Sequence, residues 1–180
     1  CNTLRAGYPE SKRCGEALCQ AYRKEKGVDV VIPRLTRSYG PTLLQSDTKA
    51  MSQFLRKAVS GKDIVLKSEG NQFYSYTYAA DAVSGLLTVL LKGESGEAYN
   101  IADEKSDITL KDLAGIIAKQ CGGKVVFELP DSTEKAGYST ATKARLDGGK
   151  VKKLGWEMRY DMPAGIGRTI RILKSLQDEA

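Results

Sequence analysis

The residue types best suited to chemistry lie near the start of the printed sequence, at Tyr8 and Lys12. Residues four apart share one face of a helix, offset by about 40°. A tyrosine hydroxyl ordinarily ionises near pH ~10, and a neighbouring ammonium favours its phenolate form. Such a pair can exchange a proton with a substrate hydroxyl while hydride moves to or from a nicotinamide. The plain alternative is an exposed tyrosine beside a solvated lysine, because Tyr-x-x-x-Lys is common by chance.

Other familiar catalytic and metal-binding sets are missing from the sequence. It contains no histidine, which excludes a Ser-His-Asp or Cys-His site built within this chain. The cysteines form no Cys-x-x-Cys pair, so we expect no metal site; they are Cys1, Cys14, Cys19 and Cys121. Thiols without a disulfide framework favour a reducing compartment, and we expect the cytoplasm.

Composition excludes further classes. Hydrophobic residues make up 41% of the 180 residues and charged residues 28%, which is the range of globular domains. The longest apolar runs are too short to cross a membrane, and the polar first residues do not resemble a secretory signal. The formal net charge is +6, but basic and acidic residues alternate along the chain. We therefore expect no nucleic-acid partner and no membrane partner.

Elements that position the Tyr-Lys pair follow from hydrophobic periodicity, which alternates between helix and strand and predicts an α/β fold. A helix is expected over residues 9–26, with Pro9 in its first turn and Gly27 at its C-cap. The apolar run 28–34 is typical of a buried parallel strand. Further helices are expected over residues 48–60, 79–91, 109–122, 147–154 and 163–176, and strands over 63–67, 96–101 and 125–129. We expect residues 68–76 to form a loop.

Six segments carry a family resemblance, in order along the chain. Residues 8–16 are similar to a Tyr-x-x-x-Lys-x-x-x-Glu helix, and residues 33–41 to Arg-x-x-Asn-x-Tyr-Gly-Pro. Residues 68–76 and 78–82 parallel Gly-Asp-Gly-x-Gln-x-Arg-Asp-Phe and Tyr-Val-x-Asp-Val. Gly96–Ile101 and Leu154–Trp156 match Gly-x-x-Tyr-Asn-Ile and Leu-Gly-Trp. Together they resemble the extended short-chain dehydrogenase/reductase family, in its NAD-dependent epimerase/dehydratase, nucleotide-sugar branch.

The resemblance implies roles for particular residues. Tyr8 would be the catalytic acid/base, and Lys12 would hold the nicotinamide ribose of NAD or NADP and tune Tyr8. The backbone around Leu35 would lie near the nicotinamide carboxamide. Arg37 stands where the family has a substrate-binding Asn, and Tyr74 where it has an Arg on the substrate phosphates. A guanidinium at position 37 could supply the missing phosphate contact.

Four other matched residues have simpler structural interpretations, which we favour. Arg34 is expected in a buried ion pair at the end of its strand, and Tyr39 as an anchor for the following loop. Asp81 is expected to cap or brace the helix that follows it. Trp156 is expected to pack rather than to bind.

The glycine-rich turn that seats a dinucleotide pyrophosphate does not occur in the sequence. The resemblance therefore implies the C-terminal part of a Rossmann-like enzyme together with its substrate-binding subdomain. Residues 1–40 would end the NAD(P)-binding domain, and residues 41–180 would be mostly the substrate-binding subdomain. The fragment alone should be inactive.

Two hypotheses about function remain open. In the first, the full-length parent is an epimerase, dehydratase, decarboxylase or reductase of a nucleotide sugar, with C4 chemistry favoured. In the second, the chain is a non-catalytic substrate-binding or dimerisation domain of the same fold. The resemblance also implies a homodimer, and the candidate surface is an apolar stripe through Ala17, Leu18, Ala21 and Tyr22, which could equally pack on its own sheet.

Overall fold

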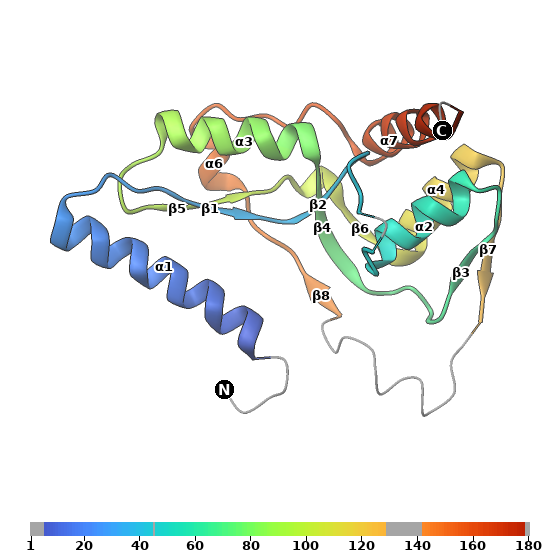
Figure 1. Ribbon diagram of the computed structural model, residues 1–180, viewed down its shortest axis with the longest axis horizontal. Coiled ribbons are helices and arrows are strands. Elements are labelled where there is room, and N and C mark those ends of the chain that lie inside the picture. Colours follow the sequence, from blue (N-terminus) through green and yellow to red (C-terminus); the bar gives the residue numbers. More distant parts are fainter. Residues whose placement is uncertain (1–5, 45, 129–141, 179–180) are drawn as a thin grey trace.

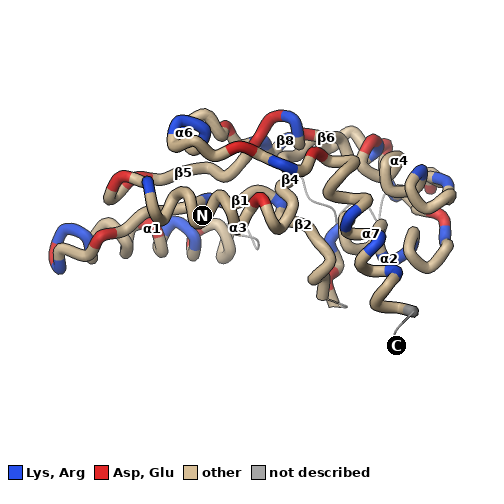
Figure 2. The backbone as a smooth tube through the Cα atoms, turned by 90° about the horizontal axis from the view of Figure 1, so that it is seen from above, with Lys and Arg blue, Asp and Glu red and all other residues tan. Residues whose placement is uncertain are grey.

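The computed structural model describes residues 6–44, 46–128 and 142–178 (Figure 1). A two-stranded sheet lies beside the helix that bears Tyr8 and Lys12. Strand β1 (Ile32–Leu35) pairs in parallel with β5 (Ala98–Ile101). Helices α1 (Gly7–Lys26) and α3 (Ala79–Lys92) lie on one side of this sheet, and the short α6 (Gly149–Lys153) lies on the other (Figure 2). The core of this group consists of Val89, Tyr99, Ile101, Val151 and Trp156, and α1 contributes no residue to it.

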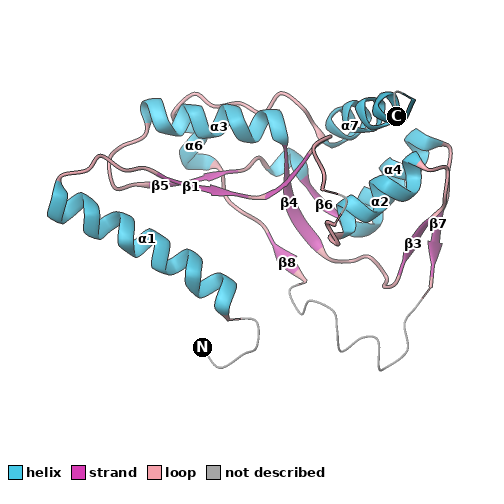
Figure 3. Cartoon of the chain, viewed as in Figure 1, coloured by secondary structure: helices cyan, strands magenta, loops and turns pink. Residues whose placement is uncertain are grey.

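A second group of elements follows β1 (Figure 3). Strand β4 (Phe73–Tyr78) pairs in parallel with β2 (Arg37–Tyr39) and β8 (Lys143–Ala144), and antiparallel with β6 (Asp107–Thr109). Strand β3 (Ile64–Leu66) pairs in parallel with β7 (Val125–Phe127). A 3-10 turn, η1 (Glu104–Ser106), precedes β6.

Three helices build the larger core of this second group: α2 (Ala50–Val59), α4 (Leu110–Cys121) and α7 (Met162–Asp178). Leu55, Leu113 and Ile166 are completely buried between them. The two cores draw on interleaved stretches of the chain, because α3 and β5 follow β4 in sequence but pack beside β1. The division of the chain at residue 40 stays a prediction.

The helices form close to where the periodicity predicts them, and their ends obey local rules. Thr109 caps α4, because its Oγ1 accepts a hydrogen bond from the Asp112 amide at 3.0 Å and donates to Asp112 Oδ2 at 2.6 Å. Gly27 and Gly122 end α1 and α4 in the left-handed conformation, with φ of 65° and 73°. The expected caps at Thr109 and Gly27 are therefore confirmed.

The strands depart further from expectation. The run 28–34 becomes a strand only from Ile32, and Ile32 is its one buried residue, because β1 has a single neighbour, β5, within the described residues. The expected loop at 68–76 is wrong from Phe73 onward, where β4 begins. Residues Tyr74–Tyr78 are all buried, and the alternation of tyrosine with Ser75 and Thr77 is a strand pattern that the expected loop did not take into account. Strands β2, β6 and β8 were likewise not predicted.

Candidate functional site

The helix α1 brings Tyr8 and Lys12 together in its first turns. Lys12 Nζ lies 5.5 Å from the centroid of the Tyr8 ring, and Tyr8 is 74% exposed. Pro9 occupies the first turn, where its missing amide hydrogen costs nothing. The phenol and the ammonium therefore lie on one exposed face, where both can reach a ligand.

The polar side of α1 faces the neighbouring sheet. Gln20 Nε2 donates to the Gly96 carbonyl at 2.6 Å, and Arg23 Nε donates to Ser95 Oγ at 3.3 Å. Gly96 has a φ of 84°, and a Cβ there would lie 2.8 Å from Arg23 Nε, so this close approach requires glycine. No side chain of α1 is fully buried, and these contacts hold the helix by hydrogen bonds.

The third contact of α1 is a two-pronged ion pair between Glu16 and Arg34 of β1. Arg34 Nε donates to Glu16 Oε1 at 2.7 Å, and Nη2 donates to Oε2 at 2.6 Å. The hydrogen bond from Arg34 lowers the pKa of Glu16, and the same bond raises the pKa of Arg34. Arg34 does form the expected ion pair at a strand end, but the expectation that the pair is buried is wrong, since its side chain is 48% exposed.

The apolar stripe of α1 is exposed rather than packed on the sheet, although Ala17, at its edge, borders the space between α1 and β1. Leu18 is 56% exposed and Tyr22 is 52% exposed, and Cys14, Ala17 and Ala21 are exposed as well. The stripe therefore does not pack on its own sheet, which was one of the two possibilities that the sequence left open.

A second pair of candidate residues is brought together by β2 and β4. The Arg37 guanidinium carbon lies 3.6 Å from the centroid of the Tyr74 ring, a stacked cation–π contact. Tyr74 is only 6% exposed, whereas Arg37 is exposed. Tyr74 thus serves as a platform, and Arg37 is the member of the pair that a ligand can reach. Burial raises the pKa of the neighbouring Tyr76 to about 12, and the charge of Arg37 offsets part of this rise.

Leu35 lies at the end of β1, two residues before Arg37, and is 45% exposed. Chain continuity therefore keeps Leu35 and Arg37 close. Figure 1 shows the first turn of α1 apart from the end of β1, the strand that carries Leu35. The candidate residues form two separate pairs rather than one closed pocket.

Three matched residues are structural. Asp81 is 1% exposed and braces a distant segment, because its two oxygens each accept a hydrogen bond at 3.0 Å, from the amides of Arg159 and Tyr160. Trp156 is buried and donates to Ser84 Oγ at 3.1 Å. Tyr39 is 3% exposed and packs edge-on against Tyr78, and this burial raises its pKa.

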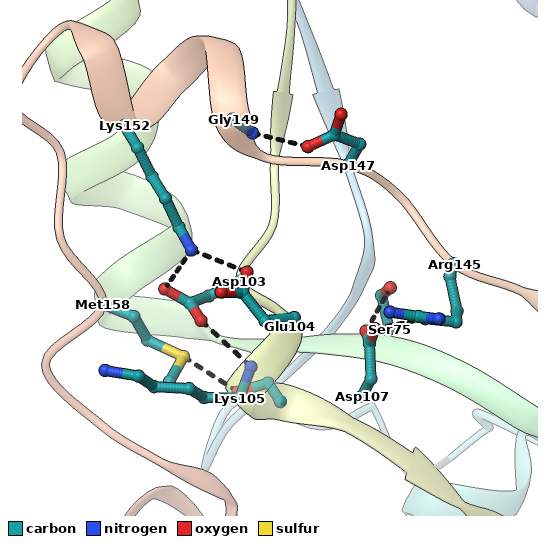
Figure 4. Close-up of polar contacts among 11 residues, drawn as sticks. Ser75, Asp103, Glu104, Lys105, Asp107, Arg145, Asp147, Gly149, Lys152 and Met158 are labelled. Atoms are coloured by element: carbon teal, nitrogen blue, oxygen red, sulfur yellow. Dashed lines mark hydrogen bonds and ion pairs between the residues drawn. The ribbon is translucent and has the colours of Figure 1, made fainter.

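A polar network attaches the segment after β8 to the sheets (Figure 4). Ser75 Oγ donates to Asp107 Oδ1 at 2.6 Å and accepts from the Leu146 amide at 3.0 Å. Arg145 Nε donates to Asp107 Oδ2 at 2.5 Å, and Lys152 pairs with Asp103 at 3.2 Å. Its acidic residues are matched by cations, and no cluster of ligating side chains suited to a metal ion occurs among the described residues. No local pattern in the sequence predicts this network.

Comparison with known proteins identifies the fold. The model of the NAD dependent epimerase/dehydratase family matches residues 3–102, more than half of the chain. The chain belongs to this family. A UDP-glucuronic acid decarboxylase 1 from Xenopus tropicalis is 28% identical over 98% of this chain, but only over 41% of its own length.

Solved structures of two other proteins superimpose on this chain and support the same fold. A dTDP-glucose 4,6-dehydratase from Bacillus anthracis, solved in complex with NAD, superimposes with a TM-score of 0.80 at 22% identity, covering 96% of this chain and 53% of the other. A UDP-glucose 4-epimerase from Thermotoga maritima, solved with UDP-glucose, gives a TM-score of 0.78 at 22% identity, covering 90% and 51%. The chain thus has an α/β fold that matches about half of an extended epimerase/dehydratase structure.

Candidate donors for one end of a dinucleotide occur among the described residues. Tyr8 and Lys12 offer exposed donors of the kind that ribose hydroxyls accept. A hollow of about 280 Å³ lies between α1 and the β1–β5 sheet, lined by Arg13, Glu16, Ala17, Gln20, Ile32, Arg34 and Ala98. This volume lies just below the range of small-molecule sites, and NAD is a large ligand. The sequence has no glycine-rich turn for the pyrophosphate.

Among the described helices, none combines the length and apolarity needed to cross a bilayer.

Proposed function

We propose that this chain is the C-terminal half of a cytoplasmic extended short-chain dehydrogenase/reductase that acts on a nucleotide sugar with NAD or NADP. The observation that carries the proposal is the Tyr8–Lys12 pair on an exposed helix face of a member of the epimerase/dehydratase family. Lys12 Nζ lies 5.5 Å from the centroid of the Tyr8 ring. Matching proteins named as decarboxylase, dehydratase and epimerase, of which the chain covers 41%, 53% and 51%, support a sugar nucleotide as the substrate class.

Under this proposal, Tyr8 exchanges a proton with a hydroxyl of the sugar, with C4 the favoured position. When bound, NAD(P) supplies the hydride acceptor. Lys12 would hold the nicotinamide ribose and favour the ionised phenol, since an ammonium stabilises a nearby negative charge. The Leu35 backbone would lie near the carboxamide, and Arg37, supported by Tyr74, would hold the substrate diphosphate through charged hydrogen bonds.

Replacing Tyr8 by Phe in the full-length enzyme tests the proposal most directly. The change removes one hydroxyl, so turnover should fall by about 10²–10⁴-fold, as for loss of a general acid/base, while NAD affinity stays within a few fold. Steady-state kinetics and calorimetry measure the two effects. Tyr22→Phe, about four turns further along the same helix, is the matched control and should leave turnover unchanged.

A near-normal kcat for Tyr8→Phe would show that Tyr8 takes no part in the proton transfer. It would then favour the second hypothesis, a binding or dimerisation domain of the same fold without catalysis. The retained Tyr8–Lys12 contact argues for the enzyme, because a non-catalytic lineage has no chemical use for the pair.

A further inference from the structure

The hydrogen bonds that hold α1 to the rest of the molecule are spread unevenly along the helix. The contacts of Gln20 and Arg23 with the turn at 95–96 lie in its C-terminal half. The Glu16–Arg34 ion pair is the sheet contact nearest to Tyr8 and Lys12. No residue of α1 is fully buried, so packing contributes little to fixing the direction of the helix.

Because the contacts lie mostly toward the C-terminal end of α1, a small tilt of the helix produces a large displacement of its N-terminal end. From Gln20 to Tyr8 the helix rises by about 18 Å, at roughly 1.5 Å per residue. A tilt of about 10° around Gln20 would therefore move the first turn by about 3 Å. Anchoring at Glu16 opposes this tilt and shortens the free arm to about 12 Å. Displacements near 1 Å at reacting groups can cost on the order of 10²-fold in rate.

The geometry of the ion pair suits it to resist tilting. Two parallel N–H···O bonds fix the relative orientation of a guanidinium and a carboxylate as well as their distance. Arg34 is itself set in β1, where its register partner is Asn100 of β5. Among the described residues, Arg34 is the charged group that faces Glu16 from the sheet, while Lys12 and Arg13 lie one turn earlier on the helix.

We infer that the Glu16–Arg34 pair is a positioning device, which sets the direction of α1 and thereby the location of Tyr8 and Lys12 relative to the strand that bears Leu35. Neither residue need touch substrate or cofactor. The functional part of this inference rests on the proposed function, but the mechanical part does not, since the direction of α1 can be measured without catalysis.

Energy transfer within the 180-residue chain can report this direction. Trp156 is the one tryptophan in the sequence and is buried in the core beside β5, and Cys14 is an exposed thiol on α1. With Cys1, Cys19 and Cys121 changed to Ser, a dye on Cys14 accepts energy from Trp156. Time-resolved emission then gives both the mean and the width of the distance distribution.

Glu16→Gln and Arg34→Gln should each broaden this distribution, because each leaves the N-terminal half of α1 without its anchor. Arg34→Lys keeps the charge but loses the fork, so it should give an intermediate width. The double change Glu16→Arg with Arg34→Glu should restore a narrow distribution. Glu25→Gln, an exposed carboxylate in the last turns of the same helix, is the matched control and should change nothing.

Circular dichroism of each variant would show that α1 is still helical, so that broadening reports direction rather than unfolding. An unchanged distribution in both single variants, or a swap that stays as broad as they are, would overturn the inference. In the full-length enzyme the single variants should lower kcat by about 10–100-fold with little change in KM. The Glu16 and Arg34 variants could broaden the distribution while Tyr8→Phe leaves the full-length enzyme fully active. That pair of results would reject the proposed function and support the positioning role of the ion pair.

Discussion

At the scale of single residues, two exposed cationic side chains each stand against a tyrosine, but in opposite arrangements. Lys12 leans toward an exposed phenol, whereas Arg37 covers a buried one. Stacking on Tyr74 restricts the rotamers of Arg37 and leaves the edge of its guanidinium free to donate hydrogen bonds. Tyr74 thus orients the guanidinium of Arg37, the residue that we propose to bind the substrate diphosphate.

Arg37→Ala in the full-length enzyme should weaken the binding of a nucleotide sugar more than that of NAD. A lost charge-assisted hydrogen bond costs about 1.5–3 kcal/mol, or roughly ten- to a hundredfold in affinity. Calorimetry with UDP-glucose and with NAD measures both constants. Arg37→Lys should recover part of the loss, because it keeps the charge without the fork. Equal effects on the two ligands would return Arg37 to an ordinary surface charge.

At the scale of elements, α1 and α3 lie on the same side of the β1–β5 sheet, and both expose apolar side chains. On α3 the residues Val83, Leu87, Leu90 and Leu91 are between 52% and 78% exposed, and on α1 the stripe through Leu18 and Tyr22 faces outward. Extended apolar patches of this kind usually mark contact surfaces. The orientation of the α1 stripe is what a homodimer formed through this helix would require.

Leu18→Glu should therefore weaken self-association of the full-length enzyme, because it places a charge in the middle of an apolar contact. We expect a shift from dimer to monomer at micromolar concentration, measured by light scattering after size-exclusion chromatography. Leu176→Glu on α7 is the matched control, since Leu176 is 54% exposed and Leu18 is 56% exposed. A parent that is monomeric before mutation would contradict the predicted dimer.

At the scale of the whole molecule, the chain spans about half the length of the relatives and solved structures that it matches. It has two cores of its own, one beside β1 and β5 and a larger one among α2, α4 and α7. The polar network around Asp107 ties the segment after β8 to the sheet by contacts with residues 38 and more positions earlier. These features favour folding of the chain on its own, whereas tight cofactor binding needs groups that its sequence lacks.

The 180-residue chain should accordingly bind NAD and NADP only weakly. A charged hydrogen bond from Lys12 contributes about 1.5–3 kcal/mol, whereas micromolar binding needs about 8 kcal/mol. Backbone amides of a glycine-rich turn normally supply much of the difference. Calorimetry of the isolated chain with each dinucleotide provides the measurement. A dissociation constant in the low micromolar range for either one would mean that the cofactor site lies elsewhere.

The sequence by itself indicated the family and most helices, and it singled out Tyr8 and Lys12 as a candidate acid/base pair. Helix α4 with its N-cap at Thr109, the C-cap at Gly27 and the spacing of Tyr8 and Lys12 all depend on residues a few positions apart, and local chemistry fixes such features. The order of six short motifs was enough to indicate the family that comparison then confirmed.

The tertiary structure alone decided which groups meet across long stretches of chain. Glu16 and Arg34 are 18 positions apart, and Asp81 reaches amides 78 and 79 positions away. Periodicity shows that α1 has a polar and an apolar side, but it cannot show which side faces the sheet. That choice depends on which hydrogen-bonding partners β1 and the turn at 95–96 present, and only the folded chain places those partners beside the helix.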